Sequence, residues 1–127
     1  MNYGYKKQTN LSFTDTIIKV KEELQKEGFG VLTEIDVKAT MKKKLNIDYD
    51  NYIILGACNP SFAHKALQAD KEIGLLLPCN VIIYENDGNV IVSAIVPTVA
   101  MGIANVSELN EIARQVEEKL KKVINNI

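Results

Sequence analysis

The sequence is poor in residues on which many catalytic and nucleic-acid-binding sites depend. Its 127 residues include one histidine, two cysteines and a single arginine, Arg114, and the net charge at pH 7 is −1. Short lysine runs such as residues 42–44 are typical of solvated helix faces. Because the chain is not broadly basic and has little arginine for bidentate phosphate recognition, we expect no nucleic-acid partner.

Several motifs of cofactor and metal sites are also missing. The sequence has no Gly-x-Gly-x-x-Gly run, no Walker phosphate loop and no Cys-x-x-Cys pair. A closed zinc site needs about four ligands, whereas one histidine and two cysteines supply three at most. Glu34, Asp36 or a residue of a second subunit would have to complete such a site. We therefore expect no bound metal, and no particular cofactor is indicated.

Long apolar segments are absent as well. Residues 1–10 lack the apolar core of a signal peptide, and runs such as residues 91–97 are too short to cross a bilayer. We therefore expect a cytoplasmic protein with no membrane partner, in which both cysteines are reduced. At this length, residues 1–127 are expected to form a single domain.

The first half of the chain carries clear signals for strands and helices. Residues 3–9 alternate as in a half-buried strand, and the pattern Ser12-x-x-Asp15 predicts the start of a long helix that stops at Gly28. A second strand is predicted just after that stop. Asp36 then has the position of a helix cap for a short helix over residues 37–45.

The second half begins with residues 52–57, whose almost wholly apolar sequence favours a central strand covered on both faces. A helix is predicted over residues 60–69. Two strands, residues 79–85 and 89–96, follow as a hairpin joined by the turn sequence Asn86-Asp87-Gly88.

The chain ends in an apolar stretch and a long helix. Residues 97–105 are interpreted as an irregular but apolar connection, and Ser107 opens a last helix with a continuous apolar face. The predicted fold is therefore α+β, with a mainly antiparallel sheet, two long helices on one face and two short helices. The other face is too apolar for water alone, which favours a homodimer.

Cys58 marks the candidate functional site. Asn59 is a good helix cap and Pro60 suits the first helical position, so Cys58 lies just before a helix start. The helix dipole there could favour a thiolate or bind an anion. His64 falls on or near the polar side of this helix, although a side chain leaning back toward the helix start could meet Cys58.

Cys79, in the segment LLLPCNVIIYE, could lie on a strand beside the one that bears Cys58. Three interpretations remain open: two inert buried cysteines, a thiol-reactive or redox site, and a metal site. The apolar stretch 97–103 is expected to pack on a partner subunit or over a pocket. The candidate ligand-binding residues are Cys58, Asn59, Ser61, Cys79, Asn80 and Met101.

Three blocks of the sequence carry a family resemblance that spans nearly the whole chain. GFGVLTEIDV (28–37), YIILGACNPSFAHKAL (52–67) and LLPCNVIIYE (76–85), followed by Pro97 and Met101, resemble domain-of-unknown-function family 302. The resemblance implies a TATA-binding-protein-like order of strand, helix, four strands and helix, in a small bacterial or archaeal protein that forms dimers. It implies no activity and gives no reason to infer DNA binding.

One residue departs from that family pattern, which often has an acidic residue where this chain has Val96. A site that needs a carboxylate there is therefore not supported. Three functions remain as alternatives. The first is binding of a small ligand or anion near Cys58. The second is a thiol-dependent enzyme or redox protein using Cys58 with Cys79. The third is a purely structural, dimer-forming protein.

Overall fold

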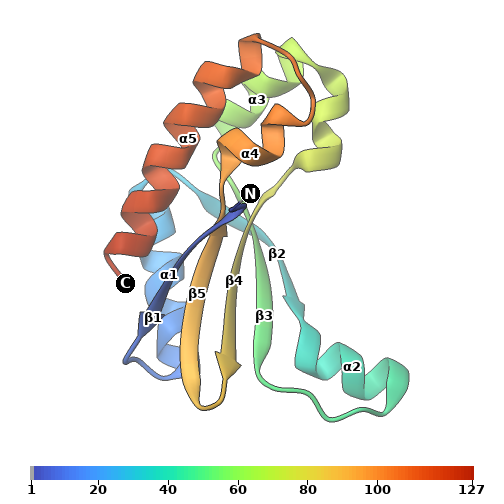
Figure 1. Cartoon of the computed structure of the whole chain (residues 1–127), viewed down its shortest axis with the longest axis vertical. Coiled ribbons are helices and arrows are strands. Elements are labelled where there is room, and N and C mark those ends of the chain that lie inside the picture. The colour runs from blue at the N-terminus through green and yellow to red at the C-terminus, as the bar shows by residue number, and fades with distance from the viewer. Residues whose placement is uncertain (1) are drawn as a thin grey trace.

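The computed structural model describes residues 2–127, which contain a five-stranded antiparallel sheet with the order β1-β5-β4-β3-β2 (Figure 1). The α+β prediction is confirmed, and the element order contains the expected strand, helix, four strands and helix. The elements are β1 (Gly4–Thr9), α1 (Phe13–Lys26), β2 (Gly30–Asp36), α2 (Val37–Leu45), β3 (Tyr52–Cys58), α3 (Pro60–Ala69), the 3-10 helix η1 (Lys71–Leu76), β4 (Cys79–Asn86), β5 (Asn89–Ile95), α4 (Pro97–Gly102) and α5 (Glu108–Asn125).

Local patterns in the sequence build the helix starts and the hairpin turn. Ser12 Oγ accepts a hydrogen bond from the backbone N–H of Asp15 at 3.0 Å, and Asp36 Oδ1 accepts one from the N–H of Ala39 at 2.9 Å. The hairpin between β4 and β5 turns through residues 87–88, both with positive φ. The sequence predictions at these places are confirmed.

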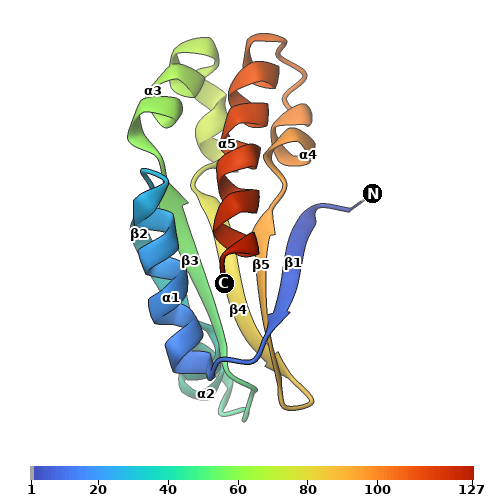
Figure 2. The same ribbon diagram turned by 90° about the vertical axis from the view of Figure 1, so that its left-hand side faces the viewer.

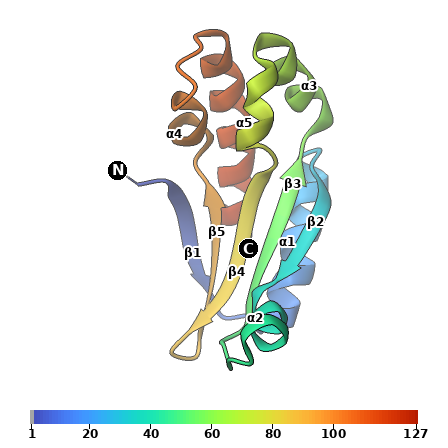
Figure 3. The same ribbon diagram turned by 90° about the vertical axis from the view of Figure 1, so that its right-hand side faces the viewer.

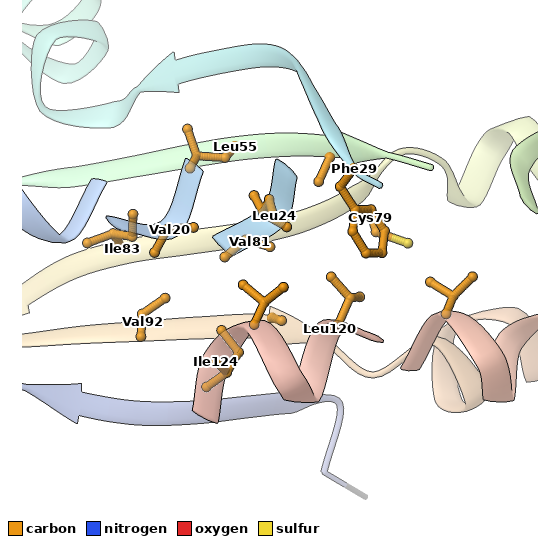
Figure 4. Packing of buried hydrophobic residues seen from close by; sticks show 14 of the residues in the cluster. Val20, Leu24, Phe29, Leu55, Cys79, Val81, Ile83, Val92, Leu120 and Ile124 are labelled. Carbon is orange, nitrogen blue, oxygen red and sulfur yellow. The ribbon is translucent and has the colours of Figure 1, made fainter. Parts of the chain in front are cut away.

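The main core lies between the sheet and the two long helices. α1 and α5 lie side by side over one face of the sheet (Figure 2), and their apolar faces meet the inward side chains of β3, β4 and β5 (Figure 4). Burial of this apolar surface is the main stabilising contribution to the fold. Fully or almost fully buried members include Val20, Leu24, Leu55, Val81, Ile83, Val92, Leu120, Val123 and Ile124.

The opposite face of the sheet is open. Figure 3 turns it toward the viewer, and no helix of residues 2–127 crosses its centre. Tyr52 and Tyr84 stack there with ring centroids 5.5 Å apart, and Ile54 and Ile82 of the same face are half-buried. The expectation that β3 is covered on both faces is therefore wrong for this chain alone, because only the side chains toward α1 and α5 are packed beneath helices.

The segment after β5 also differs from the sequence prediction. Pro97–Gly102 is not an irregular connection but the helix α4, with Pro97 at its start. The backbone N–H and Oγ1 of Thr98 donate hydrogen bonds to Glu117 Oε1, at 3.0 and 2.6 Å, and so hold α4 against α5. Partial burial acts to raise the pKa of Glu117. The hydrogen bonds from Thr98 and the Lys121 ammonium outweigh it and lower that pKa below its ordinary value.

A second, smaller core cluster forms beyond the end of the sheet. It joins α3, η1 and α4 to the first half of α5, and its buried members are Ala66, Ile73, Met101, Leu109 and Ala113. The 3-10 helix η1 was not expected from the sequence, and with α4 it adds to the two short helices that were. Ile112 of α5 packs against both this cluster and the main core. The space between the two clusters is where the candidate site lies.

Candidate functional site

An apolar pocket of about 300 Å³ lies between the two core clusters, and we call it the corner pocket. Its walls come from segments far apart in the sequence: the α1–β2 connection and β2, the end of β3, α3, the η1–β4 junction, α4 and the middle of α5. Representative wall residues are Phe29, Phe62, Leu77, Met101, Ile112 and Val116. The predicted helix start after Cys58 therefore faces a real cavity.

The turn from β3 into α3 places Cys58 and Asn59 on the pocket wall. Asn59 occupies the expected cap position, but its side chain makes no capping hydrogen bond. Its Nδ2 donates instead to the backbone carbonyl oxygen of Glu27 at 3.2 Å, which ties the end of α1 to this corner. The first turn of α3 is thus without a side-chain cap at the pocket.

Cys79 lies on the strand beside the one that bears Cys58, as the sequence suggested. β3 pairs antiparallel with β4, and Ala57 lies opposite Cys79, so Cys58 is the next residue along from that pair. Both cysteines are free, and both line the corner pocket. Cys79 lies at the end of the main core near Phe29 (Figure 4).

The two thiols differ in environment. Cys79 is 8% exposed, and its burial, with a smaller contribution from Cys58, raises its pKa to about 11. Cys79 is therefore a protonated thiol at neutral pH and a poor nucleophile in the free protein. Cys58 is only partly buried and is the more accessible of the two.

The other candidate residues are divided between the pocket and the surface. Met101 is 5% exposed and lines the pocket with Cys58, Asn59 and Cys79, whereas Ser61 and Asn80 are exposed and lie off its wall. His64 is also exposed, and no hydrogen bond within residues 2–127 joins it to Cys58. The structure therefore provides no thiol–imidazole pair for nucleophilic catalysis.

Most of the apolar wall could not be recognised in the sequence. Leu32 reaches it from β2, at an irregularity in the pairing of β2 with β3 between Val31 and Thr33, and is 66% exposed. No feature of the sequence signals that bulge. Phe62 was recognisable as an apolar residue of α3. The spacing of residues along a helix cannot show that its neighbours across the cavity belong to α5.

The side chains that line the corner pocket limit the kinds of molecule it can bind. Apart from the amide of Asn59 and the two thiols, its side chains are hydrocarbon or thioether groups. Among residues 2–127, no three or more histidine, cysteine, aspartate or glutamate side chains gather as a metal-binding group. The same residues include no helix long and apolar enough to span a membrane. An apolar molecule fits this wall better than a hydrated anion does.

The comparisons with known proteins agree on the fold and its family. The family described as Domain of unknown function DUF302 matches residues 5–127. A solved structure, described as an uncharacterized conserved protein DUF302 from Bacillus stearothermophilus, is 29% identical, with a TM-score of 0.93. The match covers 99% of this chain and 98% of that one. None of the curated proteins matches this chain. The resemblance noted from three sequence blocks is confirmed.

Proposed function

This chain belongs to the DUF302 family, and we propose that it binds a small, mainly apolar molecule in the corner pocket. The observation that supports the proposal is an open cavity of about 300 Å³ with an almost wholly apolar wall. Small-molecule sites commonly measure about 300–1,000 Å³ and combine such a wall with a few polar groups. The volume is at the lower end of that range, so the ligand is small.

The polar groups at one end suggest the form of this ligand. The uncapped start of α3 carries partial positive charge, and the Asn59 amide lies beside it on the wall. A molecule with an apolar body and one polar or anionic end group would match both parts of the pocket. We also propose that the protein is cytoplasmic, where reducing conditions would keep both pocket cysteines as thiols.

Ala63→Leu tests this proposal, because Ala63 lines the pocket and a larger side chain would fill part of it. The probe is the fluorescent dye anilinonaphthalene sulfonate, which joins apolar rings to one anionic group. Overpacking costs about 1–3 kcal/mol, so the Kd of the dye is expected to rise about 5- to 150-fold, measured by fluorescence titration.

Ala39→Leu is the matched control, since Ala39 lies exposed on α2 away from the pocket. It should bind the dye as the unaltered protein does. Equal dye affinity in both variants would show that the dye binds outside the corner pocket. If the unaltered protein does not bind the dye, the result would argue against the proposal.

The open face of the sheet supports a second role, formation of a homodimer. Its central strands present Tyr52, Ile54, Ile82 and Tyr84 outward, and none of these side chains is charged. β4 is the middle strand of five, so these side chains lie near the centre of the sheet. If two sheets stack face to face around a two-fold axis, the apolar centre of one copy lies over that of the other. The centres of this face in two copies would therefore meet without opposing like charges.

Ile82→Lys is expected to weaken dimerisation by at least about 100-fold, because it buries a charge at the centre of that contact. Analytical ultracentrifugation over a concentration series measures the change. Leu75→Lys, at a residue that is 81% exposed on η1, is the control and should leave the dimer intact. If the unaltered protein stays monomeric over the whole concentration series, the proposed homodimer is rejected.

A further inference from the structure

We infer that β2 is a docking edge for an extended peptide segment of another protein, which adds to the sheet as a further strand and places one apolar side chain in the corner pocket. β2 lies at the edge of the sheet, with β3 as its one neighbouring strand (Figure 3). All but one of its residues are exposed. The inference rests on the proposed function, because in both the corner pocket must accept an apolar group from outside the chain.

The outer backbone groups of β2 are free in residues 2–127. In an antiparallel sheet, an edge strand directs the N–H and C=O of every second residue away from its neighbour. Outside the ladder with β3, no hydrogen bond in the described part of the chain involves the backbone of residues 31–35. These groups can therefore bind a further strand, and such main-chain hydrogen bonds supply the affinity in strand addition.

The two edges of the sheet differ in their charged side chains. Lysine on an edge strand discourages pairing with another chain, and β1, the opposite edge, carries the exposed Lys6. On β2, Glu34 already pairs with Lys21 of α1 at 2.8 Å. Asp36 caps α2 by accepting a hydrogen bond from the N–H of Ala39. β2 is therefore the edge whose charges are engaged within the chain and do not oppose strand addition.

The corner pocket lies at the start of this edge. Leu32 lines the pocket and is 66% exposed, so it stands at the pocket mouth, whereas the buried Phe29 lies deeper in the wall. Opposite residues of paired strands have side chains about 5 Å apart. A side chain of the added strand beside Leu32 can therefore enter the pocket. An open edge gives affinity in strand addition, and an adjoining side-chain pocket gives specificity.

The pocket and the strand define the chemistry of the peptide. A cavity of about 300 Å³ with an almost wholly apolar wall accepts a large apolar side chain, such as that of leucine or phenylalanine. Ile35 pairs with Ile54 on the open face and is uncharged, as is Thr33, so the peptide needs no charged residue beside them. All strand pairs of this sheet are antiparallel, and an antiparallel peptide presents its carboxyl-terminal part to the pocket.

A second copy of β2 is a poorer occupant of this edge. Two copies would pair around a two-fold axis that passes through a residue paired with itself. With the axis at Thr33, Glu34 of one copy lies opposite Leu32 of the other. With the axis at Glu34, Asp36 takes that place, so both registers bring a carboxylate to the apolar pocket mouth. An axis at Leu32 makes the bulges of both strands coincide, which interrupts the ladder.

Binding of a synthetic peptide tests the inference. The probe is a fluorescein-labelled, carboxyl-amidated peptide of about eight residues, within the usual range of strand lengths, in which threonine and valine alternate before a penultimate leucine. We expect saturable binding of one peptide per chain, measured by fluorescence polarisation. Replacing that leucine by aspartate should raise the Kd about 10- to 100-fold, because its apolar burial is lost. Absence of saturable binding, or equal affinity of the two peptides, would overturn the inference.

N-methylation of the probe shows whether it binds as a strand. Alternate residues of an added strand donate hydrogen bonds to β2, whereas the residues between them point to solvent. Two peptides methylated at successive central nitrogens should therefore differ, with one Kd at least about threefold higher than the other. Hydrogen exchange at the amides of residues 31–35 should also slow when the unmethylated peptide binds. Equal affinities of the two methylated peptides would exclude strand addition.

Ala63→Leu tests whether the leucine of the probe occupies the pocket, and it should raise the Kd of the peptide about tenfold. Ala39→Leu on α2 is the matched control and should leave that Kd unchanged. Circular dichroism and thermal unfolding check the fold of each variant. Gly74→Leu replaces Ala63→Leu if the latter unfolds, because Gly74 lines the pocket and an added Cβ there meets no atom within 4 Å. Equal peptide affinity in the pocket variant and the control would overturn the inference.

The dye assay distinguishes failure of this inference from failure of the proposed function. Dye binding that is sensitive to Ala63→Leu, together with no peptide binding, would reject strand addition alone. Peptide binding that depends on the leucine, together with no dye binding, would support strand addition and reject the small organic ligand. An apparent peptide Kd that rises with protein concentration would show that a second copy competes for the edge, and would overturn the choice of another protein as partner.

Discussion

Gly56→Ala is expected to lower the free energy of unfolding by about 2–3 kcal/mol, within the range for overpacked cores. Gly56 is buried in β3, and an added Cβ would overlap Thr33 Oγ1 on the neighbouring strand and lie 2.8 Å from Cγ of Pro78. Pro78 also forms part of the pocket wall, so relief of the overlap would disturb the corner pocket. Urea unfolding followed by circular dichroism measures the stability change.

Gly30→Ala is the matched control for this substitution. Gly30 also lies in a strand of the sheet, β2, but an added Cβ there would meet no atom within 4 Å. Its stability should stay within about 0.5 kcal/mol of the unaltered protein, or rise slightly because alanine restricts the unfolded chain. A similar loss in both variants would mean that backbone freedom, not crowding, is the reason for glycine at position 56.

Leu120→Ala is expected to have the largest effect on stability, a loss of about 2–5 kcal/mol. Leu120 lies on α5 with 1% of its surface exposed and packs in the main core between the long helices and the sheet (Figure 4). The truncation removes apolar contacts and leaves a cavity that neighbouring side chains can fill only in part. Thermal unfolding and urea unfolding should both show the change.

The comparison for Leu120 is Leu45→Ala, at the end of α2, where the side chain is 61% exposed. Its stability should change by no more than about 0.5 kcal/mol, because little buried surface is lost. A small effect of Leu120→Ala would contradict the packing of α5 on the sheet. A large effect of Leu45→Ala would indicate that this residue is covered in solution.

The features that the sequence revealed are those decided by neighbouring residues. A cap such as Ser12 or Asp36 binds an N–H three residues away, so its pattern is visible in any short window. The hairpin turn at residues 87–88 is local for the same reason. The position of Cys58 before a helix start was likewise predictable, and Cys79 does lie on the strand beside it, as the sequence suggested.

The features that the sequence concealed depend on contacts between distant segments. α4 is apolar because it packs on α5. An irregular connection that is covered by other segments can have the same composition. A helix and an irregular connection therefore cannot be distinguished here from the sequence alone. Asn59 has the residue type of a side-chain cap but bonds to Glu27 on another element. The presence of the cavity depends on how closely the two core clusters approach each other. The periodic spacing of apolar residues in the sequence does not indicate that distance.

The position of β1 at the edge of the sheet has a consequence for the order in which the protein forms on the ribosome. β1 is synthesised before every other strand of the sheet, yet its partner is the last strand, with Thr9 paired to Val90 and Gly4 to Ile95. The hydroxyl of Tyr5 also donates to Asn125 Oδ1 of α5. β1 therefore cannot take its place at the edge of the sheet until β5 has been synthesised, and it stays unpaired while the strands between them in sequence are made.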